Sequence, residues 1–186
     1  MFKLLFAKIR IIFRAARIRV VALSRGSRIS LGATIYIHAG ARLFIGEGVR
    51  VGKGCTMSVL PGAVLELQDG CTINAGTFIY CASNVRIGKR TMIAHYCSIL
   101  DHDYDIHSGD SFFDKPKVSE SIIIGDNVWL GAYALILKGV TIGNNSVVGA
   151  QTMVKESVPE GMIAYCYSNS QLKMKNLNTK CNGLKK

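Results

Sequence analysis

An aliphatic residue recurs at every sixth position along most of this 186-residue chain. In the second half the series is unbroken and consists of Ile124, Leu130, Ile136, Ile142, Val148 and Val154. Four positions after each of them stands a small or β-branched residue: Val128, Ala134, Val140, Ser146, Thr152 and Val158. Helices place apolar residues every three or four positions and amphipathic strands at alternate positions, so neither pattern fits. A six-residue period is typical of a parallel β-helix, in which each flat face is one short strand.

The first half has the same period, interrupted by small shifts of frame. Its series are Ile45, Val51 and Met57; then Leu67, Ile73, Ile79 and Val85; then Ile87, Ile93 and Ile99. We expect the aliphatic residue to fill the core and the small residue to point into a corner. Glycine directly follows four of the later aliphatic residues, as in Leu130-Gly131, and we expect it there because glycine tolerates turn dihedrals. Three faces of this length predict a coil of about eighteen residues.

A single solenoid accounts for the whole chain, because stacked repeats bury their core against neighbouring repeats. We predict an amphipathic helix over residues 1–25, a β-helix over 26–160 with a loop excursion at 103–121, and a C-terminal strand and basic tail over 161–186. An apolar content of 49% with only three prolines argues against disorder. The six cysteines form no CxxC pair, so we interpret them as packing residues and expect no metal and a reducing cytosol.

The N-terminal segment is strongly basic in a chain whose formal net charge is +11. No acidic residue precedes Glu47, and one helical face gathers Phe2, Leu5, Phe6, Ile9, Phe13, Ala16 and Val20. A basic amphipathic helix indicates contact with an anionic membrane surface. A helix docked on the solenoid or on a second subunit is the alternative. Charges interrupt each apolar run, which excludes a signal peptide or a membrane span. The motifs of nucleic-acid binding are missing, so no nucleic acid is expected.

The six-residue period breaks once, between Ile99 and Ile122. The break holds His102 and His107, two of the four histidines, and six of the twelve acidic residues. A long irregular excursion from a regular scaffold is usually functional. A solvated loop that tolerates polar residues is the alternative.

Two stretches of the chain resemble the hexapeptide-repeat acyltransferases. They read IGDNVWLGAYALILKGVTIGNNSVVGAQTMVKESVP from Ile124 and INAGTFIYCASNVRIGKRTMIAHYCSILDHDYDIH from Ile73. The likeness covers roughly residues 40 to 160 and is greatest for the maltose and galactoside O-acetyltransferases and their polysaccharide O-acetyltransferase relatives. It implies an all-β fold, a left-handed parallel β-helix. It also implies a homotrimer with active sites between neighbouring subunits, and acetyl-CoA as the acyl donor.

By this resemblance His102 matches the catalytic base of the family. A sugar hydroxyl is a poor nucleophile until a base removes its proton, and imidazole titrates near the working pH. Asp101, Asp103 or the preceding backbone would orient the ring, and the sequence leaves the three open. Asp101, Asp103 and Tyr104 are also predicted to contact the acceptor.

Further positions match the family in the two stretches. Asn74 matches an asparagine that contacts the acceptor, although asparagine also suits a turn for backbone reasons. Trp129, the only tryptophan, matches a residue that walls the active site, with plain packing as the alternative.

The predicted coenzyme groove is lined by small residues. Gly131, Ala132 and Ala150 match positions where small size and backbone groups matter most. Lys155 stands where the family usually has threonine, so its contact with the coenzyme is left open. The Gly-x-Pro-Ala turn of relatives is replaced by the sequence YCYSNS from Tyr165, which leaves the adenine end of the coenzyme site open as well.

The sequence thus predicts an acetyl-CoA-dependent O-acetyltransferase acting on a saccharide or lipid-linked glycan, such as a capsule or O-antigen precursor. We expect it in the cytoplasm or at the inner face of the cell membrane. An N-acetyltransferase of an amino sugar is one alternative. A metalloenzyme like the γ-type carbonic anhydrases is another, but Glu66 stands where its third histidine would lie. A non-catalytic β-solenoid scaffold is the last.

Overall fold

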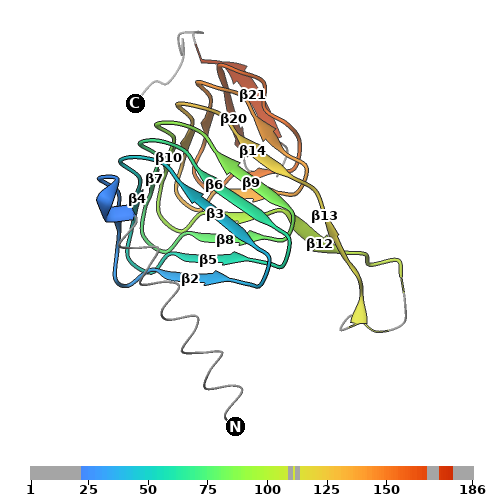
Figure 1. Cartoon of the computed structure of the whole chain (residues 1–186). Coiled ribbons are helices and arrows are strands. Elements are labelled where there is room, and N and C mark those ends of the chain that lie inside the picture. The colour runs from blue at the N-terminus through green and yellow to red at the C-terminus, as the bar shows by residue number, and fades with distance from the viewer. Residues whose placement is uncertain (1–21, 109–110, 112–113, 167–171, 178–186) are drawn as a thin grey trace.

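The computed structural model describes residues 22–108, 111, 114–166 and 172–177. Within these ranges the chain winds as a parallel β-solenoid whose strands stack one above another, coil upon coil (Figure 1). The predicted fold class, an all-β parallel β-helix of hexapeptide repeats with one protruding loop, is confirmed. The predicted N-terminal helix lies outside the described residues except for its end, where residues 22–24 are helical.

Three sheets form the three faces of the solenoid. The eight-stranded sheet contains β1 (Arg28–Ile29), β4 (Arg50–Val51), β7 (Thr72–Ile73), β10 (Met92–Ile93), β15 (Trp129–Leu130), β18 (Val147–Val148), β20 (Met162–Cys166) and β21 (Leu172–Asn176). The six-stranded sheet contains β2 (Thr34–Ile37), β5 (Thr56–Val59), β8 (Phe78–Cys81), β11 (Ser98–Leu100), β16 (Leu135–Leu137) and β19 (Met153–Val154). The five-stranded sheet contains β3 (Arg42–Ile45), β6 (Val64–Leu67), β9 (Asn84–Ile87), β14 (Ile122–Ile124) and β17 (Thr141–Ile142).

Three edges join these faces, and we number them in the order in which the chain meets them. The first edge leads from the eight-stranded to the six-stranded sheet and includes residues 94–97 and 131–134. The second edge leads from the six-stranded to the five-stranded sheet and includes residues 82–83 and 138–140. The third edge leads back to the eight-stranded sheet.

The aliphatic residues of the six-residue period form the core, as predicted. Ile124, Leu130 and Ile136 lie on the five-, eight- and six-stranded sheets in turn, and the next three members of the series repeat that order. All six side chains are fully buried. Each step of six residues therefore moves the chain to the next face. One inward-pointing side chain per step is enough to give every face of every coil a core residue.

The predicted coil length holds only in the later coils. Trp129 pairs with Val147, eighteen residues on, as three repeats of six require. Arg28 pairs with Arg50, and Arg50 with Thr72, so each of the early coils has 22 residues. The additional residues lengthen strands and corners there, which accounts for the frame shifts in the first half of the sequence.

The glycines that follow core residues have a different role from the one predicted. The residue with left-handed backbone dihedrals lies two positions after such a glycine, for example Asn127 and Tyr133, with φ of 53° and 61°. At Gly131 a Cβ atom would lie 2.5 Å from the backbone nitrogen of Ala150 in the next coil. Glycine is needed at this position because neighbouring coils approach closely, and the turn dihedral is taken by other residues.

Cysteines of the solenoid act as packing residues. Cys55, Cys71, Cys81 and Cys97 are all fully buried or nearly so. Burial raises the pKa of Cys71 and that of Cys81 to about 12, with nearby carboxylates adding to the effect. These thiols therefore stay protonated at neutral pH and behave as small apolar side chains.

Two additions extend the solenoid. Between β11 and β14 the chain leaves the second edge as a hairpin of β12 (His102–Tyr104) and β13 (Lys117–Ser119), which projects in Figure 1. At the C-terminal end, β20 pairs with β21 in antiparallel fashion. No helix in the described part of the chain is long and apolar enough to cross a lipid bilayer.

Candidate active site

His102 lies at the root of the projecting hairpin. It is the first residue of β12 and pairs with Ser119 across the antiparallel ladder. Strand β11 of the six-stranded sheet ends at Leu100, only two residues earlier, so the solenoid fixes the backbone position of His102. The position follows from the break in the repeat, because the chain leaves the second edge here and returns to it at β14.

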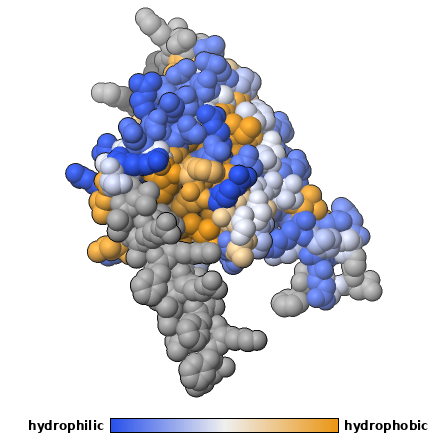
Figure 2. Space-filling model, in the orientation of Figure 1, coloured by the Kyte–Doolittle hydropathy of each residue, from blue (hydrophilic) through white to orange (hydrophobic). Residues whose placement is uncertain are grey.

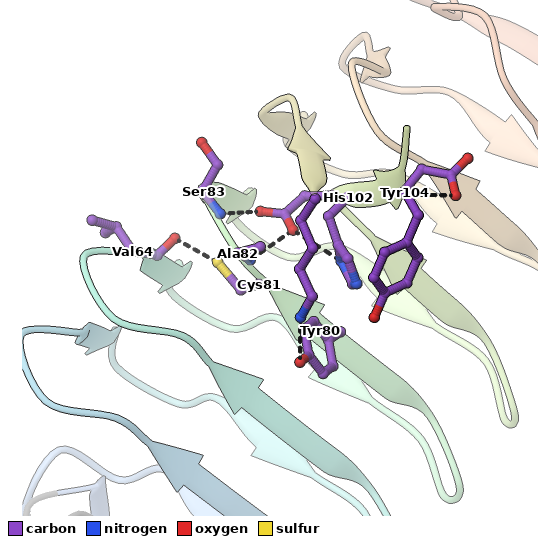
Figure 3. Close-up of polar contacts among 10 residues, drawn as sticks. Val64, Tyr80, Cys81, Ala82, Ser83, His102 and Tyr104 are labelled. Atoms are coloured by element: carbon purple, nitrogen blue, oxygen red, sulfur yellow. Dashed lines mark hydrogen bonds and ion pairs between the residues drawn. The ribbon is translucent and has the colours of Figure 1, made fainter. Parts of the chain in front are cut away.

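The imidazole of His102 sits between two tyrosine rings (Figure 3). Its centroid lies 4.5 Å from that of Tyr80 and 6.3 Å from that of Tyr104, the second in an edge-on arrangement. The side chain is 12% exposed. Its Nδ1 atom is buried without a hydrogen-bond partner, 3.7 Å from an oxygen of Asp101. That separation is too long for a hydrogen bond but short enough for the carboxylate to stabilise an imidazolium.

Asp101 is fully buried, and its carboxylate binds backbone groups of the preceding coil. Its two oxygens accept hydrogen bonds of 2.7 Å from the backbone N–H groups of Ala82 and Ser83. Figure 3 shows these contacts to the left of the histidine. This geometry does not support the predicted contact of Asp101 with an acceptor, because its oxygens are engaged and shielded from solvent. Asp101 lies instead where it positions the loop and faces the imidazole.

The pKa of His102 is lowered from its ordinary value of 6.5. Burial is the largest cause, since it disfavours the charged imidazolium, and the positive charge of Lys117 adds to it. The carboxylates of Asp101 and Asp103 oppose the shift without cancelling it. The neutral imidazole, the form that can accept a proton, is therefore favoured near neutral pH.

Two residues of this cluster, Tyr80 and Lys117, were not among the residues predicted from the sequence. Lys117 on β13 donates a 3.1 Å hydrogen bond to the Tyr80 hydroxyl and lies above both tyrosine rings. Tyr80 occupies an outward position of β8, in the coil before His102. Alternation along β8 would have placed the Tyr80 side chain outside, but nothing in the sequence pairs it with a residue 37 positions away.

Of the remaining acceptor candidates, only Tyr104 contacts His102. Asp103 is exposed, and its carboxylate accepts the backbone N–H of Tyr104 at 2.8 Å. Asn74 lies on the first edge, where its side-chain amide donates to the Ile93 carbonyl at 3.0 Å. Trp129 lies half-exposed on the eight-stranded sheet, in register with Met92. Asn74 and Trp129 thus share neither an edge nor a face with His102.

The predicted coenzyme residues gather mainly on the first edge. Gly131 packs against the backbone of Ala150, and the carbonyl of Ala132 accepts the N–H of Gln151 at 2.8 Å. Lys155 lies after β19 at the second edge and is exposed. From Ala134 at the first edge to Lys138 at the second edge of the same coil, the chain runs through β16 and spans roughly 13 Å at about 3.3 Å per residue. One copy of the chain therefore keeps His102 apart from the first-edge residues.

No group of three or more metal-ligating side chains occurs among the residues that the structure describes. His107, the second histidine of the loop, lies in a turn where its backbone N–H donates to Asp105 at 3.0 Å.

Two family models match the chain. Residues 121–156 match the bacterial transferase hexapeptide (six repeats), and residues 42–81 match the hexapeptide repeat of succinyl-transferase. The first lies over the later coils, which have the eighteen-residue length, and the second over the early, longer coils.

Several proteins similar to this chain are named as acetyltransferases. The chain is 29% identical to the putative lipopolysaccharide biosynthesis O-acetyl transferase WbbJ of Escherichia coli over 136 residues, which cover 69% of either chain. It is 33% identical to galactoside O-acetyltransferase of Escherichia coli over 127 residues, or 58% of this chain and 62% of that protein. A mutant of AntD, an N-acyltransferase from Bacillus cereus, was solved with dTDP-4-amino-4,6-dideoxyglucose and coenzyme A. It has the same fold, with a TM-score of 0.69 and 23% identity over 81% of this chain and 80% of that one.

This chain has the same fold as the coenzyme A-bound acyltransferase, with a histidine at the root of a projecting hairpin. The matched repeats and the named relatives make the chain similar to the hexapeptide-repeat acetyltransferases.

Proposed function

We propose that this protein transfers the acetyl group of acetyl-CoA to a hydroxyl of a saccharide, with His102 as the general base. The observation that carries the proposal is the imidazole itself, held mainly neutral at the root of the hairpin on an acetyltransferase fold. The names of the two Escherichia coli relatives support an O-linked product and a sugar acceptor. Neighbouring folds that act on amino sugars make N-acylation the alternative to be tested.

In the proposed reaction His102 takes the proton from the acceptor hydroxyl while its oxygen attacks the thioester carbonyl. A carbon–oxygen bond forms, and the carbon–sulfur bond then breaks as the imidazolium returns the proton to the departing thiolate. Asp101, 3.7 Å from Nδ1, stabilises the positive charge that the ring carries between the two steps. Both protons and electrons balance without a metal or an oxidant.

We infer that the active site is completed by a second copy of the chain in a homotrimer. The candidate coenzyme residues Gly131, Ala132 and Ala150 lie on the first edge, whereas His102 lies on the second. Contact between the first edge of one copy and the second edge of its neighbour would bring the two sets together. Asn74 and Trp129 would reach the acceptor from the same neighbour, and Lys155 would approach the coenzyme from the His102 side.

We further propose that the basic N-terminal segment holds the enzyme against the inner face of an anionic membrane, where lipid-linked glycans are assembled. The support is the sequence alone, since the segment combines an apolar helical face with clustered lysines and arginines.

The test is release of free thiol from acetyl-CoA in the presence of individual saccharides, including matched pairs of amino and hydroxyl sugars. We expect acceptor-dependent release with hydroxyl sugars and an ester product that mild base cleaves. His102→Ala should lower the rate by about 10²- to 10⁴-fold while the protein remains folded. An amide product would establish the N-acyl alternative, and turnover by His102→Ala near the wild-type rate would remove His102 from the mechanism.

A further inference from the structure

A lysine ammonium lies beside the candidate base without an acidic partner. Lys117 donates to the Tyr80 hydroxyl at 3.1 Å, and its Nζ lies 5.0 Å from the centroid of the Tyr80 ring and 5.9 Å from that of Tyr104. The same two rings flank His102. An ammonium has three N–H groups, and among the described residues only the Tyr80 hydroxyl accepts one of them.

The neighbouring carboxylates do not neutralise this charge. Asp101 is fully buried, and its oxygens accept the N–H groups of Ala82 and Ser83. Asp103 turns back to accept the N–H of Tyr104. None of the ion pairs within the described ranges includes Lys117, whose side chain is exposed. A positive charge with free donors therefore stands open to solvent next to the imidazole.

We propose that Lys117 and the Tyr80 hydroxyl form an anion-binding subsite for the acceptor, so that the saccharide acetylated at His102 carries a carboxylate or a phosphate. The inference rests on the proposed function and names its substrate class. Charge-assisted hydrogen bonds from an ammonium are strong and suit both anions. The rings of Tyr80 and Tyr104 offer the apolar faces against which a sugar ring packs.

The anion belongs to the acceptor rather than to the coenzyme for a geometric reason. The thioester carbon must meet the acceptor oxygen at His102 for transfer to occur. The phosphates of coenzyme A lie at the far end of its long pantetheine arm, well beyond the reach of Lys117. An anion held at Lys117 during the reaction must therefore be carried by the second substrate.

The test measures binding, so it does not depend on turnover. The ring signals of His102 in the full-length protein are followed by NMR, with His102→Ala used to assign them. Three probes are added separately: methyl β-D-glucuronide, glucose 1-phosphate and the neutral methyl β-D-glucoside. The pH is kept where His102 is neutral in every variant, so that the imidazole itself attracts no anion.

We expect saturable shifts with at least one anionic probe and weaker binding of the neutral one. Lys117→Gln should weaken anion binding by about 10- to 100-fold, whereas Lys117→Arg should retain part of it. Lys89→Gln, which removes a lysine paired with Asp69 at the third edge, serves as the control and should change nothing. A response to the glucuronide alone identifies a carboxylate site, and a response to glucose 1-phosphate alone identifies a phosphate site.

The inference fails if the wild type binds charged and neutral probes equally, if neither anion shifts the His102 signals, or if Lys117→Gln binds anions as the wild type does. These results differ from failure of the proposed function, in which no saccharide accepts an acetyl group although anions still bind beside His102.

Discussion

At the scale of single residues, the chemistry of the site depends on how His102 is kept neutral. Burial is the largest cause of its lowered pKa, the charge of Lys117 lowers the pKa further, and Asp101 and Asp103 oppose both effects. The outcome is a base whose pKa lies below its ordinary value of 6.5 although a carboxylate is only 3.7 Å away. The exposed Lys117 thus has two roles. Its positive charge lowers the pKa of the imidazole, and its N–H groups are available to an anion.

The pH dependence of kcat/KM should reflect the effect of the Lys117 charge on the pKa of His102. In the proposed mechanism the neutral imidazole is the active form, so activity should fall as pH drops through the pKa of His102, and we expect this acid limb below about pH 6.5. Removing the positive charge in Lys117→Gln raises the pKa, so the limb should move to higher pH. Rate profiles of both proteins check this, with Lys89→Gln as the control. An unchanged limb in Lys117→Gln would contradict the assigned role of the charge.

Asp101 should matter for stability as much as for catalysis. In Asp101→Asn one acceptor becomes an NH₂ group facing a buried backbone N–H, at a cost of about 1–3 kcal/mol. For a chain of this size that corresponds to a fall in Tm of about 2–4 °C per kcal/mol. Thermal unfolding measures this loss of stability. For the exposed Asp103→Asn, the free energy of unfolding should stay within about 0.5 kcal/mol of the wild-type value. Equal melting of the two variants would show that the buried contacts contribute little.

At the scale of elements, stability comes from coils that touch their neighbours along the whole stack. The corners are the tightest points, because a glycine of one coil lies directly on the backbone of the next. The hairpin of β12 and β13 is the exception, since its strands pair only with each other. The scaffold can therefore carry a functional insertion at the second edge without disturbing the stacking of β11 and β14.

A methyl group placed between two coils tests this stacking. In Gly88→Ala the new Cβ would overlap the carbonyl of Gly125 in the next coil, and neither backbone can move alone. We expect a loss of about 1–3 kcal/mol in the free energy of unfolding, measured with denaturant. Gly149→Ala is the matched control, because its nearest atom is the Tyr165 Cβ at 3.3 Å. If both substitutions cost the same, close approach of the coils is not what requires glycine.

At the scale of the whole molecule, the separation of His102 from the first edge is the reason for the proposed site between two copies of the chain. A closed symmetric ring can join the first edge of each copy to the second edge of the next, so that every first and second edge is in contact. The surface in Figure 2 is mixed in character, with apolar and strongly polar areas side by side on the face shown.

Mixed assemblies provide a direct test of a shared site. His102→Ala removes the base, and Ala132→Trp fills the predicted coenzyme groove, so each variant alone should be inactive. In mixed trimers formed at equal amounts, about a quarter of the interfaces combine two intact edges and should recover activity. Light scattering establishes the trimer, and thiol release measures recovery. A monomer in solution, or trimers that recover nothing on mixing, would place the whole site within one copy.

Membrane contact through the N-terminal segment predicts salt-dependent binding to vesicles. Each basic residue near an anionic surface contributes about 1 kcal/mol, and the effect falls off within a Debye length. Full-length protein should sediment with anionic liposomes at low salt and less so at high salt. A version that starts at Gly26 should stay in the supernatant. If both remain in the supernatant at low salt, the segment serves the protein fold or its assembly.

The sequence by itself determined the solenoid, its core and the place of the insertion. These follow from a repeated local rule, in which one aliphatic side chain per six residues turns inward, and any departure from the period is visible in the sequence. The family resemblance added His102. What the tertiary structure decided are contacts between coils: Lys117 with Tyr80, Asp101 with Ala82 and Ser83, and Gly131 against Ala150. Such contacts depend on coil lengths, which vary from 16 to 22 residues among the coils without the hairpin, and on side-chain directions across the stack. No local pattern encodes either of these, so only the folded chain shows which residues surround the histidine.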